Sequence, residues 1–234
     1  IDSAVLLALP FAPDARSATA EASALSEKSE GRLRPAATVD PTQGADAVAE
    51  ALAAWSKVRN LAAVKLYPGY RAFYPNDVRL EPVYEFAAHR KLPVMLHQGD
   101  TMDPSGLVKF ARPIELDEVA VRYRDVRFVL CHMGNPWMEE AAEIVYKNAN
   151  VYADTSGLLA SPRAPYYPRM FERAQRRLYH AIVTVGDPQR ILYGSDWPLE
   201  SIRSAVALVS GLDLPEEHRE GILGKNALTL FSNA

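Results

Sequence analysis

Five side chains that can bind a metal or transfer a proton share one setting in this sequence. Lys65, His97, His132, Asp154 and Asp196 each lie at or next to the end of a short apolar run, directly before a turn signal. Imidazole and carboxylate groups are common ligands of catalytic metals and common general acids and bases. Their shared position predicts that they meet at one edge of a sheet and form an active site there.

The apolar runs behind these residues predict parallel strands. The runs are short and rich in Val, Leu and Ile, and they lack clean polar alternation, a pattern typical of strands buried on both faces. Seven of them occur, at 3–10, 34–41, 62–69, 92–99, 126–134, 150–157 and 190–198.

Segments with helical periodicity separate the runs and predict repeated βα units. We expect helices over 45–60, 80–90, 114–123, 136–148, 167–185 and 199–210. Such units form either a barrel or a doubly wound sheet. A doubly wound sheet usually carries a glycine-rich phosphate loop after its first strand, whereas here the first run is followed by Pro10-Phe11-Ala12-Pro13. We therefore predict an α/β fold of the (β/α)₈ TIM-barrel type, with residues 1–234 forming a single domain.

Composition narrows the class of protein further. Hydrophobic residues make up 48% and charged residues 24%, and the formal net charge is −3, which argues against a nucleic-acid binder. No apolar run approaches the roughly 20 residues of a membrane span. The single cysteine, Cys131, rules out an internal disulfide and fits a reducing cytoplasm. We expect a cytoplasmic protein that acts on a small molecule, without nucleic-acid or membrane partners; a homo-oligomer is left open.

Side-chain alternation along the strands predicts which residues face the barrel interior. It places Lys65, His97, Asp154 and Asp196 above small or apolar residues of the same strands. Counted back from His132, the same alternation turns Cys131 outward. We therefore expect Cys131 to be a small core residue and not the nucleophile of a Cys–His pair.

Four strand-end motifs, taken in order, resemble a known family. They are VMLHQGD, FVLCHMGNP, NVYADTSG and ILYGSDWP, and the set resembles the amidohydrolase superfamily. The nearest branch is the amidohydrolase 2 group, which contains hydrolases and aminocarboxymuconate-semialdehyde-type decarboxylases. The likeness extends from Ile1 to the closing segment ILGKNALTLF.

The resemblance implies a distorted (β/α)₈ barrel and a divalent metal, usually zinc. His97 matches a metal ligand of the family. His132 matches a histidine that binds the metal in binuclear members and faces water or substrate in mononuclear ones. Asp196 matches an aspartate that contacts the metal and handles the proton of the bound water.

The sequence departs from the family pattern at one place. The family's first strand normally ends in His-x-His, or has a carboxylate in place of one histidine. This chain has five histidines, and no two are spaced in that way. Its seven runs correspond to the second to eighth strands, and it begins with Ile1. We therefore expect the domain to be N-terminally incomplete, with the first strand missing and carrying the remaining ligands.

Several residues keep a second interpretation. Asp196 could instead cap a helix that begins at 198 or 199, and Asp154 could cap its own loop. Lys65 could bind a substrate carboxylate, form a salt bridge or, as in some binuclear members, be carbamylated. Segments 100–113 and 157–168 are predicted lids, and we expect Arg112 and Trp197, together with Lys65 and Asp154, to contact substrate.

These features favour a metal-dependent hydrolase. It would cleave a C–N or C–O bond, as in an amide, a lactone or a related ester, of a small polar substrate through a metal-activated water. Asp196 would accept the proton of that water, and His132 would orient the water or polarise the substrate carbonyl. The alternatives are a metal-dependent decarboxylase or hydratase acting on a carboxylated substrate, and a non-catalytic barrel.

Overall fold

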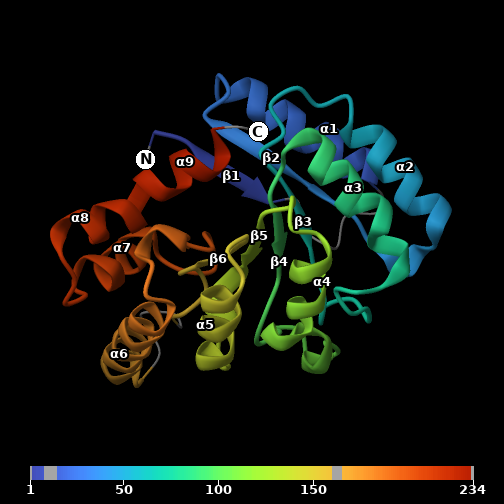
Figure 1. Ribbon diagram of the computed structural model, residues 1–234. Helices are drawn as coiled ribbons and strands as arrows, with labels where there is room; N and C mark the ends of the chain where they lie inside the picture. The colour runs from blue at the N-terminus through green and yellow to red at the C-terminus, as the bar shows by residue number, and fades with distance from the viewer. Residues whose placement is uncertain (1, 8–14, 160–164, 233–234) are drawn as a thin grey trace.

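One parallel sheet organises the part of the chain that the computed structural model describes, residues 2–7, 15–159 and 165–232. Its strands are hydrogen-bonded in sequence order, so each pairs with the next along the chain. The sheet curls into part of a barrel (Figure 1). The seven strands are β1 (Ala4–Leu7), β2 (Leu33–Thr38), β3 (Ala63–Leu66), β4 (Val94–Leu96), β5 (Phe128–Leu130), β6 (Val151–Asp154) and β7 (Ile191–Leu192).

Every predicted strand is present where the sequence placed it. β3, β4 and β5 are buried along their whole length, as expected of strands covered on both faces. The register is parallel throughout; Val64, for example, is opposite Val94, which is opposite Phe128. The predicted fold is confirmed: an α/β chain with the strand order of a (β/α)₈ barrel and seven of its eight strands in the described residues. The end of the first predicted run, 8–10, lies outside them.

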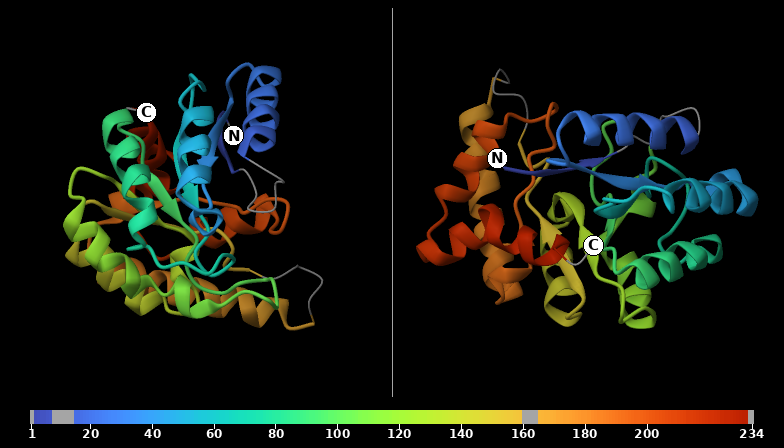
Figure 2. Two further views of the ribbon diagram at one scale, coloured as in Figure 1. Left: turned by 90° about the vertical axis from the view of Figure 1, so that its right-hand side faces the viewer. Right: turned by 90° about the horizontal axis from the view of Figure 1, so that it is seen from above.

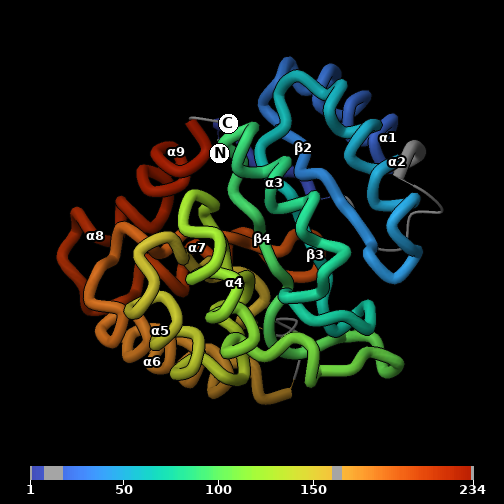
Figure 3. Tube along the Cα trace, turned by 45° about the vertical axis from the view of Figure 1, so that its right-hand side comes forward, coloured from blue at the N-terminus to red at the C-terminus, as the bar shows by residue number. Residues whose placement is uncertain are grey.

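Helices cover the outer face of the sheet, as the view from above shows (Figure 2). α1, α2 and α3 lie side by side outside β2, β3 and β4 (Figure 3). The α-helices are α1 (Ala15–Lys28), α2 (Ala45–Trp55), α3 (Glu81–Arg90), α4 (Asp117–Arg122), α5 (Met138–Lys147), α6 (Tyr167–Val185), α7 (Ile202–Ser210), α8 (Glu216–Glu220) and α9 (Asn226–Phe231). Short 3₁₀ turns occupy 41–43, 78–80, 108–111, 113–116, 131–134 and 188–190, and a π turn joins α8 to α9.

The predicted helices agree with the observed helices to different degrees. α6 has the predicted bounds, because Pro168 lies in its first turn and Gly186, in the left-handed conformation, ends it. α1 was not predicted: its buried residues among those whose side chains are described are the small residues Ala18, Ala22 and Ser26, so it shows little apolar periodicity. α7 begins at Ile202, three residues later than expected, because the side chain of Ser201 caps it by accepting from Ser204 N.

The sheet separates two apolar layers. The larger one packs the helices against the outward side chains of the strands, among them Val64, Leu96 and Leu130. The smaller one lies on the inner face, where Ala63, Met95 and other inward side chains of the strands contact Leu230 of α9. The polar residues at the strand ends lie directly above this inner layer.

No helix in the described ranges is both long enough and apolar enough to cross a membrane.

Candidate active site at the carboxyl ends of the strands

The two strand-end histidines contact each other. Nε2 of His132 lies 3.1 Å from Nδ1 of His97, and the ring centroids are 4.9 Å apart. His97 is 4% exposed, and His132 is partly exposed. Burial, the neighbouring imidazole and Lys65 together hold the pKa of His97 well below its usual range.

The outer nitrogens of the pair each face a carbonyl oxygen. Nε2 of His97 lies 2.9 Å from the carbonyl oxygen of Asp100, which can only accept. Nδ1 of His132 lies 3.2 Å from the carbonyl oxygen of Ser156. A proton on both outer nitrogens would leave one more for the two inner nitrogens to share, and the pair would then carry one positive charge. The hydroxyl of Ser156, 2.9 Å from Nδ1 of His132, can instead donate to that nitrogen, which leaves both rings neutral. Burial lowers the pKa of both His97 and His132 and so favours the neutral pair.

Asp154 anchors His132 through the backbone. Its Oδ1 accepts from the backbone N of His132 at 2.9 Å and from the hydroxyl of Ser156 at 2.5 Å. The same hydroxyl lies 2.9 Å from Nδ1 of His132, and the tautomer of the ring decides which of the two groups donates. Burial alone would raise the pKa of Asp154, but His132, Ser156 and Lys65 together lower it, so it stays ionised. Asp154 holds its own loop, as one interpretation predicted, and it contacts the backbone of His132. Its contact with substrate stays a prediction.

The backbone turns sharply after β5. His132 has φ 62° and Met133 has φ 45°, both in the left-handed region that non-glycine residues seldom occupy. The strand ends at Leu130, so alternation stops before His132 and cannot be counted back from it. The prediction that Cys131 points outward is wrong: Cys131 is buried in the inner apolar layer, and the turn returns His132 to the mouth above it.

Lys65 is a buried part of the floor of the site. Its Nζ donates to Sγ of Cys131 at 2.8 Å and lies 5.1 Å from the ring centroid of Tyr67. It is 1% exposed, and burial raises the pKa of the Cys131 thiol. Of the roles weighed for Lys65, direct substrate binding suits this position least, because the amine is covered; it stays an untested prediction.

Asp196 lies beside His132 at the end of β7. Its charge raises the pKa of His132, against the larger opposite effect of burial. Its own φ is 52°, a conformation that aspartate tolerates better than most residues. A Cβ added to Gly157 would lie 2.7 Å from Nδ1 of His132 and 3.3 Å from Oδ2 of Asp196. Asp196 does not cap α7, so that alternative is wrong, and its acidic side chain belongs to the mouth.

Arg112 and Trp197 lie outside this cluster of contacts. The guanidinium of Arg112 is paired with the carboxylate of Glu140 and lies 5.1 Å from the ring of Trp137. Trp197 follows Asp196 and is 70% exposed, which leaves its indole open to a ligand. Substrate contact by either residue stays a prediction. The predicted lid 157–168 is described only in part, because 160–164 lie outside the described residues.

Three further residues of the site were not predicted. The ring of Tyr70 packs edge-on against His97 at 4.6 Å between centroids. Tyr67 is buried, and burial, Cys131 and Asp196 raise the pKa of its phenol. Glu200 is 2% exposed. Tyr67 lies two residues after Lys65, so strand alternation would have placed both side chains on the same face and could have predicted Tyr67 as a site residue. No comparable pattern in the sequence predicts Glu200.

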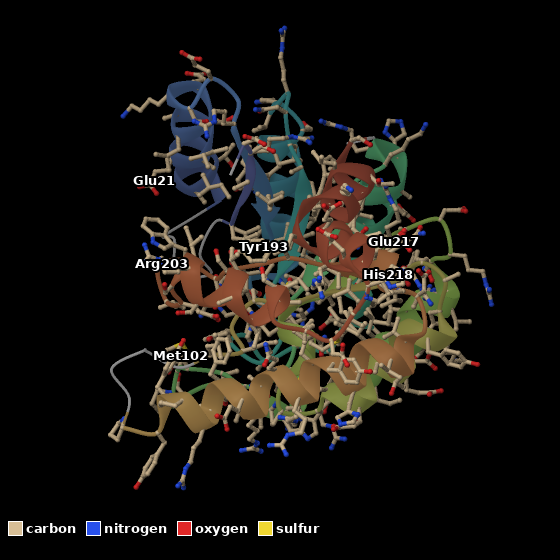
Figure 4. All side chains as sticks on the ribbon, turned by 90° about the vertical axis from the view of Figure 1, so that its left-hand side faces the viewer. Glu21, Met102, Tyr193, Arg203, Glu217 and His218 are labelled. Carbon is tan, nitrogen blue, oxygen red and sulfur yellow. The ribbon has the colours of Figure 1, made fainter. Side chains whose placement is uncertain are left out.

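The remaining histidines are not part of the site. His89 is in the last turn of α3 and His180 is exposed on α6. His218 lies beside Glu217 on α8, 3.8 Å between Nε2 and Oε1 (Figure 4). His89 and His180 are exposed and His218 is partly exposed, all three on helices.

The residues of the mouth include side chains that can bind a metal. Two imidazoles and a carboxylate are suitable donors for a divalent metal. Nowhere in the described ranges, however, are three or more His, Cys, Asp or Glu side chains arranged to hold one, and all four ring nitrogens of His97 and His132 face protein atoms. The described residues therefore do not make a metal site by themselves. The assignment of His97, His132 and Asp196 as ligands stays a prediction.

The chain is similar to known proteins both in sequence and in fold. A family model described as amidohydrolase matches residues 8–232. An uncharacterised TIM-barrel protein of Bordetella bronchiseptica superposes with a TM-score of 0.77 at 19% identity, over 100% of this chain and 78% of that chain. A search of curated proteins found no match.

Two decarboxylases have the same fold. The 2,6-dihydroxybenzoate decarboxylase of Rhizobium superposes with a TM-score of 0.69 at 20% identity, covering 99% of this chain and 84% of that one. The 5-carboxyvanillate decarboxylase of Novosphingobium aromaticivorans, complexed with manganese and a nitrobenzoic acid, gives 0.70 at 16% identity, covering 99% and 76%. At such identities the likeness concerns the fold.

Proposed function

Since the chain belongs to the amidohydrolase family, we propose that its strand-end mouth is an active site that removes the carboxyl group of a hydroxylated aromatic acid without oxidation. The observation that carries the proposal is the contact between His97 and His132, whose outer nitrogens both face acceptors. We propose that this pair, whose pKa values are lowered by burial, takes up one proton when an anionic substrate binds beside it and delivers that proton to the substrate. The two decarboxylases of the same fold support this choice of reaction.

The reaction consumes one proton. A ring hydroxyl makes the carbon that bears the carboxylate electron-rich, and that carbon takes the proton from the imidazolium of His132. The C–C bond to the carboxylate then breaks, its electron pair returns to the ring, and CO₂ leaves. Asp196, beside His132, stabilises the positive charge of the pair before transfer. Solvent then returns a proton to the histidines.

A divalent metal is a separate part of the proposal. The described residues complete no site for one, so no step above depends on it. The resemblance of the sequence favoured zinc, whereas the 5-carboxyvanillate decarboxylase complex contains manganese. Both metals belong in the test, alongside metal-free protein.

Hydrolysis is the second candidate, supported by the description of the matching family model. It would cleave an amide, a lactone or a related ester. The two candidates leave different products: decarboxylation releases CO₂ and an arene with a new C–H bond, and hydrolysis adds the elements of water to the substrate.

Product analysis in D₂O tests the proposal. Purified protein is incubated with 2,6-dihydroxybenzoate, 5-carboxyvanillate and a panel of amides and lactones, with Mn²⁺, with Zn²⁺ and with neither. We expect CO₂ and an arene that carries one deuterium at the carbon that lost the carboxylate. Hydrolysed amides or lactones without CO₂ would favour the second candidate, and no turnover of any compound would contradict both.

The other expectations from the sequence belong to the same proposal. We propose one domain, a cytoplasmic location and a small molecule as the partner, with neither nucleic acid nor membrane involved.

A further inference from the structure

Glu200 is a buried carboxyl group outside the set of residues that the proposed reaction uses. It lies between Asp196 and the start of α7, in the segment that Tyr193 and Arg203 bracket in Figure 4. Its side chain is 2% exposed. Its backbone N donates to the carbonyl of Asp196 at 3.3 Å, so the two residues belong to one tight turn.

Among the described residues, the groups that the carboxyl group of Glu200 faces are backbone amides. Oε2 accepts from the backbone N of Leu159 at 3.4 Å, and the amides of Leu158 and Gly157 also act on the carboxyl group. Oε1 has no hydrogen-bond partner among the described residues. A buried carboxyl group held by successive N–H groups fixes the path of that backbone.

The backbone that Glu200 holds is also the wall of the active site. Gly157 has φ 65°, and a Cβ there would lie 2.7 Å from Nδ1 of His132. Ser156, the residue before it, supplies both hydrogen-bond partners of that nitrogen. A shift of this segment would therefore change the hydrogen bonds of Nδ1 of His132.

We propose that Glu200 is a positioning residue: its buried carboxyl group holds the backbone of residues 157–159 and so keeps Ser156 and Gly157 against His132 and Asp196. The inference rests on the proposed function in that it takes His132 and Asp196 as the reacting groups. Glu200 does not touch the substrate. It acts through the backbone segment, and its removal should alter the geometry of His132 without removing any group that reacts.

Three variants separate positioning from general stability. Glu200→Ala removes both oxygens, and Glu200→Asp keeps the charge but shortens the reach by one methylene. Glu200→Gln keeps a carbonyl oxygen that can accept from the same amides. Glu217→Gln, an exposed acid on α8, is the matched control. Circular dichroism establishes which variants fold.

Two readouts do not need turnover. Hydrogen–deuterium exchange reports the protection of the amides of 157–159, and ¹⁵N NMR of the imidazole rings reports where His132 carries its proton. We expect exchange at 157–159 to be about tenfold faster or more in the Ala and Asp variants, with shifted His132 ring signals. The Gln variant and the Glu217→Gln control should resemble the parent protein in both measurements.

Steady-state kinetics form the third readout. Because small displacements of reacting groups are costly, we expect kcat to fall about tenfold or more in the Ala and Asp variants, with KM nearly unchanged. The Gln variant should stay within about threefold of the parent. If the parent turns over none of the test compounds, the proposed function fails, and exchange and NMR still decide the role of Glu200.

The proposal is overturned if the folded Ala and Asp variants keep parental exchange and parental His132 signals. It is also overturned if the Gln variant behaves like the Ala variant, because acceptance from the amides would then not be the cause. If Glu200→Ala does not fold, the comparison of Glu200→Asp with Glu200→Gln decides between positioning and general stability in the same way.

Discussion

Nδ1 of His97 and Nε2 of His132 face each other at 3.1 Å, although 35 residues separate them in the chain. Each ring is held from outside by a carbonyl oxygen, of Asp100 in one case and of Ser156 in the other. A neutral pair is satisfied when Nε2 of His132 donates to Nδ1 of His97 and the hydroxyl of Ser156 donates to Nδ1 of His132. The contact couples the two rings, so a proton taken up by one ring affects the other.

The first prediction concerns this pair. Replacing either histidine by glutamine removes the shared proton, so His97→Gln and His132→Gln should each lower kcat at least about 100-fold with the fold retained. Kinetics and circular dichroism measure the two effects. His180→Gln, exposed on α6, is the control and should keep parental activity. Parental turnover in either site variant would remove the pair from the mechanism.

Asp196 should be needed for its charge more than for its shape. Asn tolerates the left-handed conformation that Asp196 adopts at φ 52°, so Asp196→Asn should fold with parental thermal stability. Its kcat should nevertheless fall by about 100-fold, because the imidazolium loses its neighbouring anion. Asp196→Ala should lose about 1 kcal/mol of unfolding free energy in addition. An active Asn variant would show that the charge is dispensable.

A pair of glycine variants tests the close approach to His132. Gly157 and Gly186 have nearly the same φ, 65° and 68°, but a Cβ meets His132 at the first position and nothing within 4 Å at the second. Gly157→Ala and Gly186→Ala should therefore share a strain cost of about 1 kcal/mol in thermal unfolding. Only Gly157→Ala should lose turnover. Equal activity in the two variants would argue against the contact.

The pH dependence of stability should report the buried carboxyl group of Glu200. Burial raises the pKa of this carboxyl to about 7, from its ordinary value of 4.5. The stability contributed by the protonated form is complete below 4.5 and is lost as pH rises through 7, because the unfolded chain has already released the proton. Glu200→Gln does not titrate, so it should gain on the parent by on the order of 2 kcal/mol between pH 4.5 and 8.

Denaturant unfolding of both proteins across this pH range measures the difference. A difference that stays constant from pH 4.5 to 8 would show that Glu200 titrates normally in the folded protein.

Local patterns in the sequence were sufficient to predict the strands and the edge of the sheet at which the candidate active site lies. An apolar run ended by a turn residue is a local pattern, and parallel strands bring their carboxyl ends together whatever their partners are. The sequence therefore determined the sheet, its class and five of the residues at its mouth. It also determined the bounds of α6, because a first-turn proline and a terminal glycine act within one turn.

The tertiary structure decided what alternation and spacing do not encode. Alternation holds only while the strand continues, so the left-handed turn at His132 reversed the expected direction of Cys131. Ser201 caps α7, so the helix begins later than predicted and Asp196 is not its cap. Glu200 became a buried partner of residues 157–159 only because β6 and β7 are neighbours in the sheet. Such contacts join residues far apart in the chain, and their free energy depends on the packed fold, which no local pattern in the sequence contains.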